Sequence, residues 1–418
     1  MRAEGAERFC TSWNLRESQD FCHLTWLLQT LGLGVATSSF NIGEDPLDSL
    51  LKARGWWWSI HSGERREGGE RVTAFRANLA KLGDRGNLAK HAFKKTRTLR
   101  HPHILAIIDG QETDMALEVI CEAVTPLPDW LRAQREKASP KQLAAVLTWG
   151  LRCVLEALNF LHTQNLCHGL CCAESIFVTE SGDFKLWGLD VIASLDGEDS
   201  GHFRARESEL AALSGGAHYR SPERSSGEWD KVAKHYAASD VFSLGQAIPG
   251  MFFDDFPLEL SKVCKKMVAP QCLARAKISR ILAIEWFKSN PYNMAMLFIE
   301  ELSLKNHGEM VAFFRSLSTT MRSMPTATRI HKVVPALKSG IQRSIGPDCR
   351  AEDCREIVSA ALPALSEIGA TMTGEEYRRF VVPSVMPLFA VKDRAVRMQL
   401  LERIDALVKH MVCCISNR

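Results

Sequence analysis

A series of short motifs between Leu99 and Gly245 constrains the fold of this 418-residue chain more than any other feature. Each motif is weak alone, because stretches this short also recur by chance. Their shared order and spacing are informative together, and they indicate a single domain. The motifs are Leu99-Arg100-His101-Pro102-His103-Ile104-Leu105, Leu117–Val124, Ala157–His162, His168–Phe177, Lys185–Asp190, Ser221-Pro222-Glu223 and Ser239–Gly245.

The order of these motifs resembles that of protein kinases, which implies an α+β domain of two lobes. In a working kinase the loop that begins at His168 reads H-R-D-L-x-x-x-N, where Asp accepts the substrate proton and Asn holds magnesium. Here Leu170 stands at the Asp position and Ser175 at the Asn position. Gly188 stands where D-F-G has its metal-binding Asp. The residues therefore predict a kinase fold without the catalytic groups.

Two aspartates offer a different register for the metal-binding position. Asp183 is followed by Phe184, but Ser181-Gly182-Asp183 is typical of a tight hairpin turn between two short strands. Asp190 lies two positions after Gly188 and would need Leu189 to be looped out. We therefore keep Gly188 at the metal position.

The nucleotide side of the predicted cleft is also altered. We expect the phosphate loop at Ser62–Glu70, which has glycines but no G-x-G-x-x-G and carries acidic side chains that would repel phosphate. Phe75 stands where V-A-I-K has its phosphate-pairing Lys, and the next helix has only basic and apolar residues around Ala92. Lys81 or Lys90 could replace that Lys, although a solvated surface Lys is the simpler interpretation. If a nucleotide binds, we expect it near Gly63, Cys121 at the gatekeeper position, Glu122 and Val124.

Four further residues are expected to be structural. Glu223 and Arg275 could form a buried ion pair, since an unpaired buried charge would be costly. Asp240 is expected to cap the start of a helix, and His168 to form hydrogen bonds beneath its loop. Adjacent cysteines at 171 and 172 do not have the spacing of metal ligands, so no metal site is expected.

A family resemblance rests on three stretches. These stretches resemble the Scyl (SCY-like) pseudokinases, and they are Lys94–Gly110, Cys121–Leu127 and Lys185-Leu186-Trp187-Gly188-Leu189-Asp190. Glu375-Glu376-Tyr377 and Asp393–Arg397 resemble the repeat region of the same family. The resemblance implies an inactive kinase-like domain followed by an α-helical HEAT-repeat segment, an α-solenoid.

The expected organisation has four parts. Residues 1–50 are unassigned, 51–290 form the kinase-like domain, 291–411 the HEAT-type repeats, and 412–418 a short tail. Val333-Val334-Pro335 and Val381-Val382-Pro383 recur with similar flanks at about the period of a HEAT unit. A helical subdomain that merely packs on the large lobe is the alternative. The charged stretch from 194 to 216 is expected to be a solvated loop.

Composition narrows the functional classes. The chain has 52 basic and 49 acidic residues, a net charge of +3, so it lacks the charge signature of a DNA-binding protein. Its 13 cysteines have no regular spacing and indicate reduced thiols in a cytoplasmic protein. The apolar part of Phe21–Val35 is too short to span a bilayer, so no transmembrane span is expected.

Three functions are compatible with these residues. The first is a non-catalytic scaffold, the second an atypical or weak kinase, and the third a switch that binds ATP without metal. The missing catalytic groups favour the scaffold, which needs no cofactor, whereas the other two need ATP. The family resemblance implies vesicle traffic between Golgi and endoplasmic reticulum, with coatomer or other coat components or small GTPases as partners, or tRNA export as the alternative. It also implies a cytoplasmic protein that reaches Golgi membranes peripherally through those partners.

Overall fold

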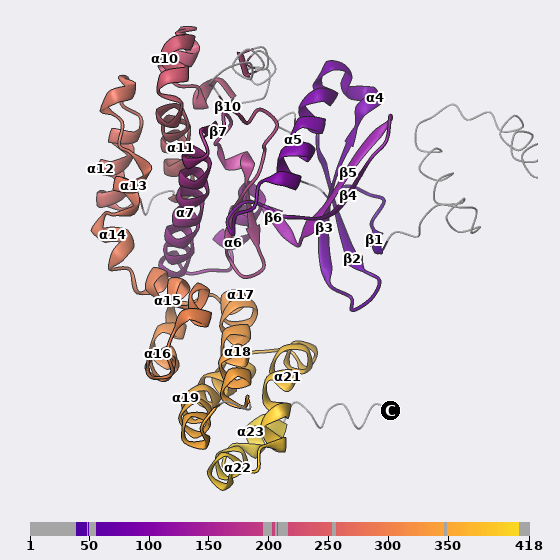
Figure 1. Ribbon diagram of the computed structural model, residues 1–418, viewed down its shortest axis with the longest axis vertical. Coiled ribbons are helices and arrows are strands. Elements are labelled where there is room, and N and C mark those ends of the chain that lie inside the picture. Colours follow the sequence, from indigo (N-terminus) through magenta and orange to yellow (C-terminus); the bar gives the residue numbers. More distant parts are fainter. Residues whose placement is uncertain are drawn as a thin grey trace, which may run out of the picture.

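The computed structural model describes residues 39–47, 49, 56–194, 203–204, 207, 216–252, 256–346 and 349–408. Two lobes lie side by side, and a helical segment follows below the large lobe (Figure 1). The α+β two-lobed domain that the motifs predicted is therefore confirmed. The expected tail, 412–418, lies outside the described residues.

The small lobe is a five-stranded antiparallel sheet with the strand order β1-β2-β3-β5-β4. Helix α5 crosses one face of this sheet and buries Ala92 and Phe93 against it (Figure 1). The alternation of side chains along the strands places apolar residues on the covered face. The elements are β1 (Phe40–Ile42), β2 (Ser59–Arg65), β3 (Arg71–Asn78), α4 (Leu79–Leu82), α5 (Gly86–Thr98), β4 (Ile107–Glu112) and β5 (Ala116–Glu122).

The hairpin between β2 and β3 corrects the expected position of the phosphate loop. Ser62–Arg65 belongs to β2, and the following turn to β3 contains Gly68 and Gly69, with φ angles of 92° and 62°. In the kinase fold the phosphate loop joins the first two strands, which here is the connection 43–58. Strand β1 also lies inside the range 1–50, so the sheet begins before the expected boundary at residue 51.

Gly63 has a packing role within this sheet rather than a place in a phosphate loop. It pairs with Ile42 on one side and Val72 on the other. A Cβ atom at residue 63 would lie 2.4 Å from Ile42 Cδ1 and 2.9 Å from the Asn41 carbonyl oxygen. The close approach of β1 therefore accounts for this glycine.

The large lobe is built around α7, a helix that begins at a capping box formed by Ser139 and Gln142. Two small sheets, β6-β8-β9 and β10-β7, border the cleft. The strands are β6 (Val124–Pro126), β7 (Leu166–Cys167), β8 (Ile176–Thr179), β9 (Phe184–Leu186) and β10 (Ala193–Ser194). The helices are α6 (Leu127–Arg135), α7 (Pro140–Thr163), α9 (Pro222–Ser225), α10 (Trp229–Lys234), α11 (Tyr236–Phe252), α12 (Leu258–Met267), α13 (Ile278–Leu282) and α14 (Glu285–Lys288).

Among the described residues α7 is the one helix long and apolar enough to cross a membrane by length and composition. Trp149, Leu155 and Leu158 of this helix have no exposed surface, because they pack in the core of the large lobe. The apolar composition of α7 is thus explained by its place in the core.

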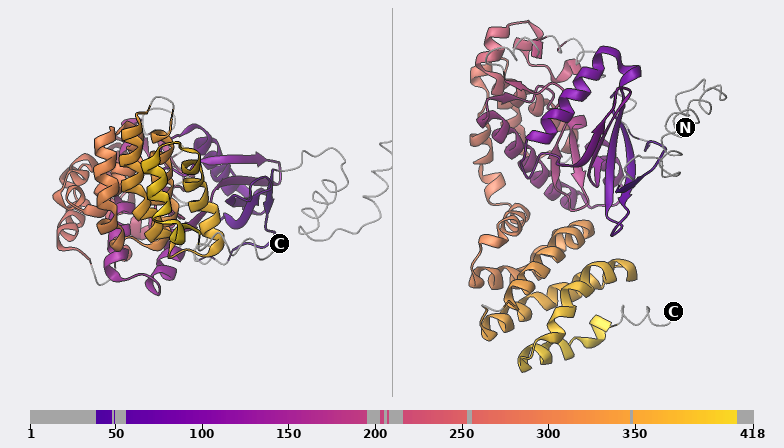
Figure 2. Two further views of the ribbon diagram at one scale, coloured as in Figure 1. Left: turned by 90° about the horizontal axis from the view of Figure 1, so that it is seen from below. Right: turned by 45° about the vertical axis from the view of Figure 1, so that its right-hand side comes forward.

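The C-terminal segment consists of helices in two rows (Figure 2). Helices α16, α19 and α22 pack on one another in one row, and α18 packs on α21 in the other. The helices are α15 (Pro291–Glu300), α16 (His307–Thr320), α17 (Thr326–Thr328), α18 (Val334–Ser344), α19 (Ala351–Gly369), α20 (Gly374–Glu376), α21 (Val382–Val385), α22 (Arg394–Leu401) and α23 (Ile404–Val408).

The two Val-Val-Pro sequences occupy equivalent places in this segment. Each follows a π-helical turn, Arg329–Val333 before α18 and Tyr377–Val381 before α21. Pro335 and Pro383 have no N–H to donate to the preceding turn, and the helix widens just before each of them. The sequence repeat is therefore also a structural repeat.

The helical segment and the large lobe share one hydrophobic core. Phe314 and Leu337 of the segment belong to the same buried cluster as Trp149 of α7. Lys332, in the first π-helical turn, forms an ion pair with Asp183 and lies 4.8 Å from the centre of the Trp149 ring. The expected boundary at residue 290 is thus no break in packing.

Candidate functional site

The space between the lobes is occupied by three consecutive tryptophans that precede β2. Trp56 and Trp57 pack against Leu170 of the catalytic-loop segment, and Trp58 packs 5.1 Å from Trp187 of the large lobe. These contacts are made from the β1–β2 connection, where a kinase has its phosphate loop. We infer that the tryptophans stand where a kinase would hold the phosphates and metal.

Asp190 fixes two of these tryptophans. The indole N–H groups of Trp57 and Trp58 both donate to Asp190 Oδ1 at 3.0 Å. The carboxyl group is fully buried, and burial raises the pKa of Asp190 to about 6 despite the two hydrogen bonds. Its second oxygen, Oδ2, has no hydrogen-bond partner within the described part of the chain. Asp190 therefore serves as the acceptor for both indoles.

Gly188 stands at the position of the missing metal-binding Asp, in a backbone conformation that favours glycine. Its φ angle is +79°, and a Cβ atom would lie 3.0 Å from Ser175 Cβ and 3.2 Å from Trp56 Cη2. A side chain at residue 188 would therefore be strained by the positive φ angle, and Ser175 and Trp56 would have to shift by a few tenths of an ångström to accept it. Among the described residues no three His, Cys, Asp or Glu side chains are grouped as metal ligands.

Phe75 lies at the centre of an aromatic cluster between the lobes. Its ring centre is 4.1 Å from that of Trp187 and 5.2 Å from that of Phe177 on β8. None of the Phe75 surface is exposed. The position of the phosphate-pairing Lys thus contributes to an apolar contact between the two lobes.

The hinge, residues Cys121–Val124 that lead from β5 into β6, is contacted by Thr73 of the neighbouring strand β3. Thr73 Oγ1 accepts a hydrogen bond from the Val124 N–H at 3.0 Å and donates to the Val124 carbonyl oxygen at 3.2 Å. Cys121 donates its S–H to the Thr73 carbonyl oxygen at 3.3 Å, and burial raises the thiol pKa well above its ordinary value. The hinge polar groups that could orient a nucleotide base at Val124 are therefore paired within the protein. Glu122, the next residue, forms an ion pair with Lys185 at 3.3 Å.

The catalytic-loop positions form packing and local hydrogen bonds. Leu170 packs with Leu88 of α5 and Val191, so an apolar contact stands where a kinase has its proton acceptor. Ser175 Oγ donates to the Cys172 carbonyl oxygen at 2.9 Å and accepts from the Cys172 N–H at 3.1 Å. Both Ser175 hydrogen bonds close a turn within the loop.

Asp240 organises this loop, and its position corrects the expected helix cap. It lies inside α11, and its carboxylate accepts hydrogen bonds from the backbone N–H groups of His168 and Gly169, each at 2.8 Å. Burial alone would raise the pKa of Asp240. The hydrogen bond and the charge of His162, 3.0 Å away, outweigh the effect of burial, so the pKa lies below its ordinary value. Asp240 therefore holds the loop to α11.

His168 is buried beneath its loop as a neutral imidazole. Its Nδ1 accepts the Leu170 N–H at 3.2 Å, so Nε2 carries the proton and donates to the Trp187 carbonyl oxygen at 3.0 Å. Burial lowers the His168 pKa, although Asp240 opposes this. The imidazole thus ties the catalytic loop to the segment that leads to Gly188.

Arg275 and Glu223 form a two-pronged ion pair at the base of the large lobe. The Nη1–Oε1 distance is 2.6 Å and the Nη2–Oε2 distance 2.8 Å, with 0% and 3% of the side chains exposed. Arg275 also donates to the carbonyl oxygens of Ala238 at 3.0 Å and Ala269 at 2.8 Å. All the polar groups of this pair that face the core are therefore used.

A second buried ion pair corrects part of the expected solvated loop. Glu207 accepts hydrogen bonds from Arg224 at 2.6 Å and Arg220 at 2.7 Å, and it is 4% exposed. Arg224 also donates to the Gly169 carbonyl oxygen at 2.8 Å. Glu207 thus anchors its stretch to the catalytic loop. The other acidic residues of that stretch lie outside the described residues.

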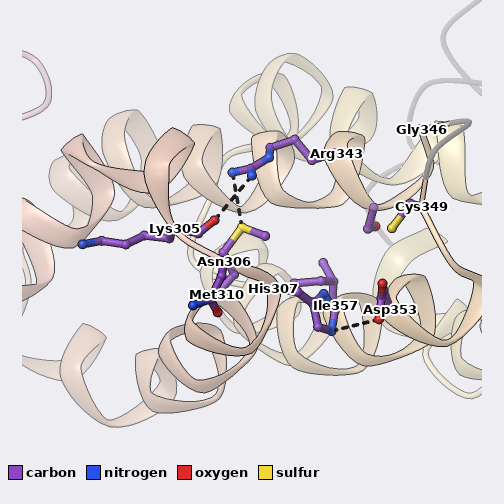
Figure 3. Close-up of a pocket in the computed structure, with 10 residues that line it drawn as sticks. Lys305, Asn306, His307, Met310, Arg343, Gly346, Cys349, Asp353 and Ile357 are labelled. Atoms are coloured by element: carbon purple, nitrogen blue, oxygen red, sulfur yellow. Dashed lines mark hydrogen bonds and ion pairs between the residues drawn. The ribbon is translucent and has the colours of Figure 1, made fainter.

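A cavity of about 320 Å³ lies in the helical segment between α16, α18 and α19 (Figure 3). Its polar groups are largely paired with their surroundings. Arg343 donates to the Leu302 carbonyl oxygen at 2.7 Å. It also contacts Met310 Sδ at 3.5 Å and the Lys305 carbonyl oxygen at 3.4 Å, while His307 lies 3.8 Å from Asp353 (Figure 3).

The fold and the filled cleft define a protein-kinase-like domain, and comparison with known proteins agrees. The protein kinase domain family matches residues 85–320, more than half of the chain. The chain belongs to this family, and its curated relatives are SCY1-like pseudokinases, as the resemblance indicated.

Three relatives illustrate the range of similarity. "Probable inactive serine/threonine-protein kinase scy1" of Dictyostelium discoideum is 27% identical over 85% of this chain and 42% of its own length. "Protein-associating with the carboxyl-terminal domain of ezrin" of Mus musculus is 25% identical over 76% of this chain and 43% of that protein. "SCY1-like protein 2" of Homo sapiens is 20% identical over 89% of this chain and 44% of that protein. This chain spans less than half the length of these relatives.

Proposed function

We propose that this chain is a catalytically inactive, kinase-like scaffold that binds other proteins. The observation that carries the proposal is the Trp57 and Trp58 contact with Asp190, which holds aromatic side chains in the cleft. Thr73 supports it, because it occupies the polar groups of the hinge. The name of the D. discoideum relative, a probable inactive kinase, supports the same class.

The test is a thermal unfolding titration of the whole chain with ATP, with and without magnesium, beside an active kinase as the positive control. We expect no change in melting temperature, because binding would have to displace the tryptophans. A shift that requires magnesium would favour a weak kinase, and a shift without magnesium would favour a nucleotide-regulated switch. Either shift would contradict the proposal.

The helical segment is proposed to be an array of HEAT-type repeats that supplies binding surface. Its two rows of helices and the repeated π-turn before Val334 and Val382 support this assignment. A second cavity of about 400 Å³ adjoins the first at Ser344 and Cys349 and extends across α19 toward Asp393. Together the two cavities run along one side of the segment.

For the cellular role we propose cytoplasmic vesicle traffic, with coat components or small GTPases as partners and peripheral attachment to Golgi membranes. This role rests on family resemblance. The name of one relative, which associates with a domain of ezrin, supports protein binding. The family resemblance gives tRNA export as the second candidate, and the name of "Cytoplasmic export protein 1" of Saccharomyces cerevisiae, 25% identical over 36% of this chain, supports a role in export. Affinity capture with the whole chain tests both: coat proteins would support traffic, and export factors alone would contradict it.

A further inference from the structure

Helix α5 and the residues that flank it carry several basic side chains and no acidic one. No acidic residue occurs from Arg85 to Ile108, although a kinase carries a glutamate on this helix to pair with the β3 Lys. The inner face of α5 is fixed by Ala92 and Phe93, which are buried against the sheet. The basic residues are Arg85, Lys90, Lys94, Lys95, Arg97 and Arg100.

Three of these cations face solvent at the C-terminal end of the helix. We call three exposed residues the basic stripe: Lys94, Arg97 and Arg100. No carboxylate of the described residues forms an ion pair with them. Lys90 differs, because it lies 3.1 Å from Glu112. The positive charge of the stripe is thus not neutralised within the described chain.

The fold does not require this arrangement. A cation in the last turn of a helix is stabilised by the helix dipole, which accounts for Arg97 but not for Lys94, one turn earlier. Like charges three positions apart on one helix face repel each other, so Lys94 and Arg97 oppose the stability of α5, while Arg100 lies two residues beyond its end. Arg97 also stacks 5.4 Å from the centre of the Phe93 ring, which restricts the position of its guanidinium group.

We propose that the basic stripe binds an acidic segment of a partner protein, rich in Asp and Glu. The guanidinium groups of Arg97 and Arg100 suit two-pronged binding of carboxylates, and Lys94, one turn before Arg97, adds a third exposed charge. An anionic membrane fits less well, because membrane-binding basic clusters usually have four or more free cations, whereas here Lys90 is paired with Glu112 and Lys95 is half-buried. The proposal extends the scaffold role to one surface, and it does not depend on the state of the cleft.

The test measures binding of a short fluorescein-labelled peptide of alternating glutamate and serine to the whole chain by fluorescence anisotropy. The stripe variant, Lys94→Glu with Arg97→Glu and Arg100→Glu, is expected to weaken binding by about tenfold or more. The milder Arg97→Lys with Arg100→Lys keeps the charge but loses the planar fork, so we expect a smaller loss. Tryptophan fluorescence checks that each variant is folded.

Helix α12 offers a matched control with the same change in net charge. Lys262, Lys265 and Lys266 are exposed on α12, and their replacement by Glu is expected to change the affinity by less than about twofold. An equal loss in both triple variants would show a net-charge effect and overturn the proposal. Absence of peptide binding by the unaltered chain would also overturn it. So would stripe-dependent binding of phosphatidylserine vesicles in place of the peptide. None of these outcomes bears on nucleotide binding, which tests the scaffold separately.

Discussion

Thr73 Oγ1 lies 3.0 Å from the Val124 nitrogen and 3.2 Å from the Val124 carbonyl oxygen, so one hydroxyl satisfies both polar groups of a hinge residue. The two residues are 51 positions apart and belong to different strands. Because Thr73 is buried, water could not easily reach the polar groups of Val124 if the hydroxyl were removed, and an unpaired buried group costs free energy.

Thr73→Ala is therefore expected to lower the free energy of unfolding by about 1–3 kcal/mol, since it leaves the Val124 N–H unpaired. Thr73→Ser keeps the hydroxyl and is the matched control, with a smaller loss. Urea unfolding followed by tryptophan fluorescence measures both. Equal stabilities of the Ala and Ser variants would show that the hydrogen bonds contribute little.

Asp190 is expected to give the chain a defined pH dependence. Burial raises its pKa from 3.8 to about 6, so the folded state binds this proton more tightly than the unfolded state. Its contribution to the free energy of unfolding is fully present below about pH 4 and falls by about 3 kcal/mol as the pH rises through about 6. Asp190→Asn cannot titrate, so its stability relative to the unaltered chain should rise between pH 4 and pH 7. Urea unfolding at several pH values measures this difference, which would be flat if Asp190 kept its ordinary pKa.

Glu223→Ala or Arg275→Ala is expected to destabilise the large lobe by about 3–5 kcal/mol, because each leaves a buried partner without its opposite charge. The double variant should be little less stable than either single variant. Chemical unfolding of the two single variants and the double variant gives a double-mutant cycle. Strictly additive losses in the free energy of unfolding would show that the pair is not coupled.

Lys332 is expected to hold the helical segment to the large lobe. Its ion pair lowers the pKa of Asp183 to about 2 against the opposing effect of burial, so the stabilisation is present above about pH 4 and is lost as the pH falls through 2. Lys332→Met keeps the apolar stem over Trp149 but removes the charge. We expect a loss of about 2–4 kcal/mol at pH 7 and faster proteolysis near residue 325.

Lys338 on α18 lies in the same segment and provides the control for this prediction, because Lys338→Met removes one charge at a half-buried position. Little change is expected there. An unchanged proteolysis pattern in Lys332→Met would contradict a docking role for the Asp183 pair.

The lost catalytic groups could be predicted from the sequence, because each depends on the chemistry of one residue within an ordered motif. Leu170, Ser175, Gly188 and Phe75 were placed in this way, and so was the Ser181–Asp183 turn, which is the hairpin between β8 and β9. The recurrence of Val-Val-Pro was also visible in the sequence, and each copy follows a π-helical turn, because the missing N–H of a proline acts within its own helix.

Only the tertiary structure decided what replaced the lost chemistry. Trp57 and Asp190 meet across 133 positions, and Lys332 meets Asp183 across 149, so no local pattern relates them. The sequence shows three adjacent tryptophans, but it does not show that they lie between the lobes. No pattern in the sequence indicates that Thr73 contacts the hinge. Asp240 was expected at a helix cap because its motif was read locally, whereas folding turned its carboxylate toward the backbone of a distant loop. The sequence alone determined which catalytic groups are missing, because the identity of one residue within an ordered motif decides each case. The packing of distant segments determined which groups fill the cleft.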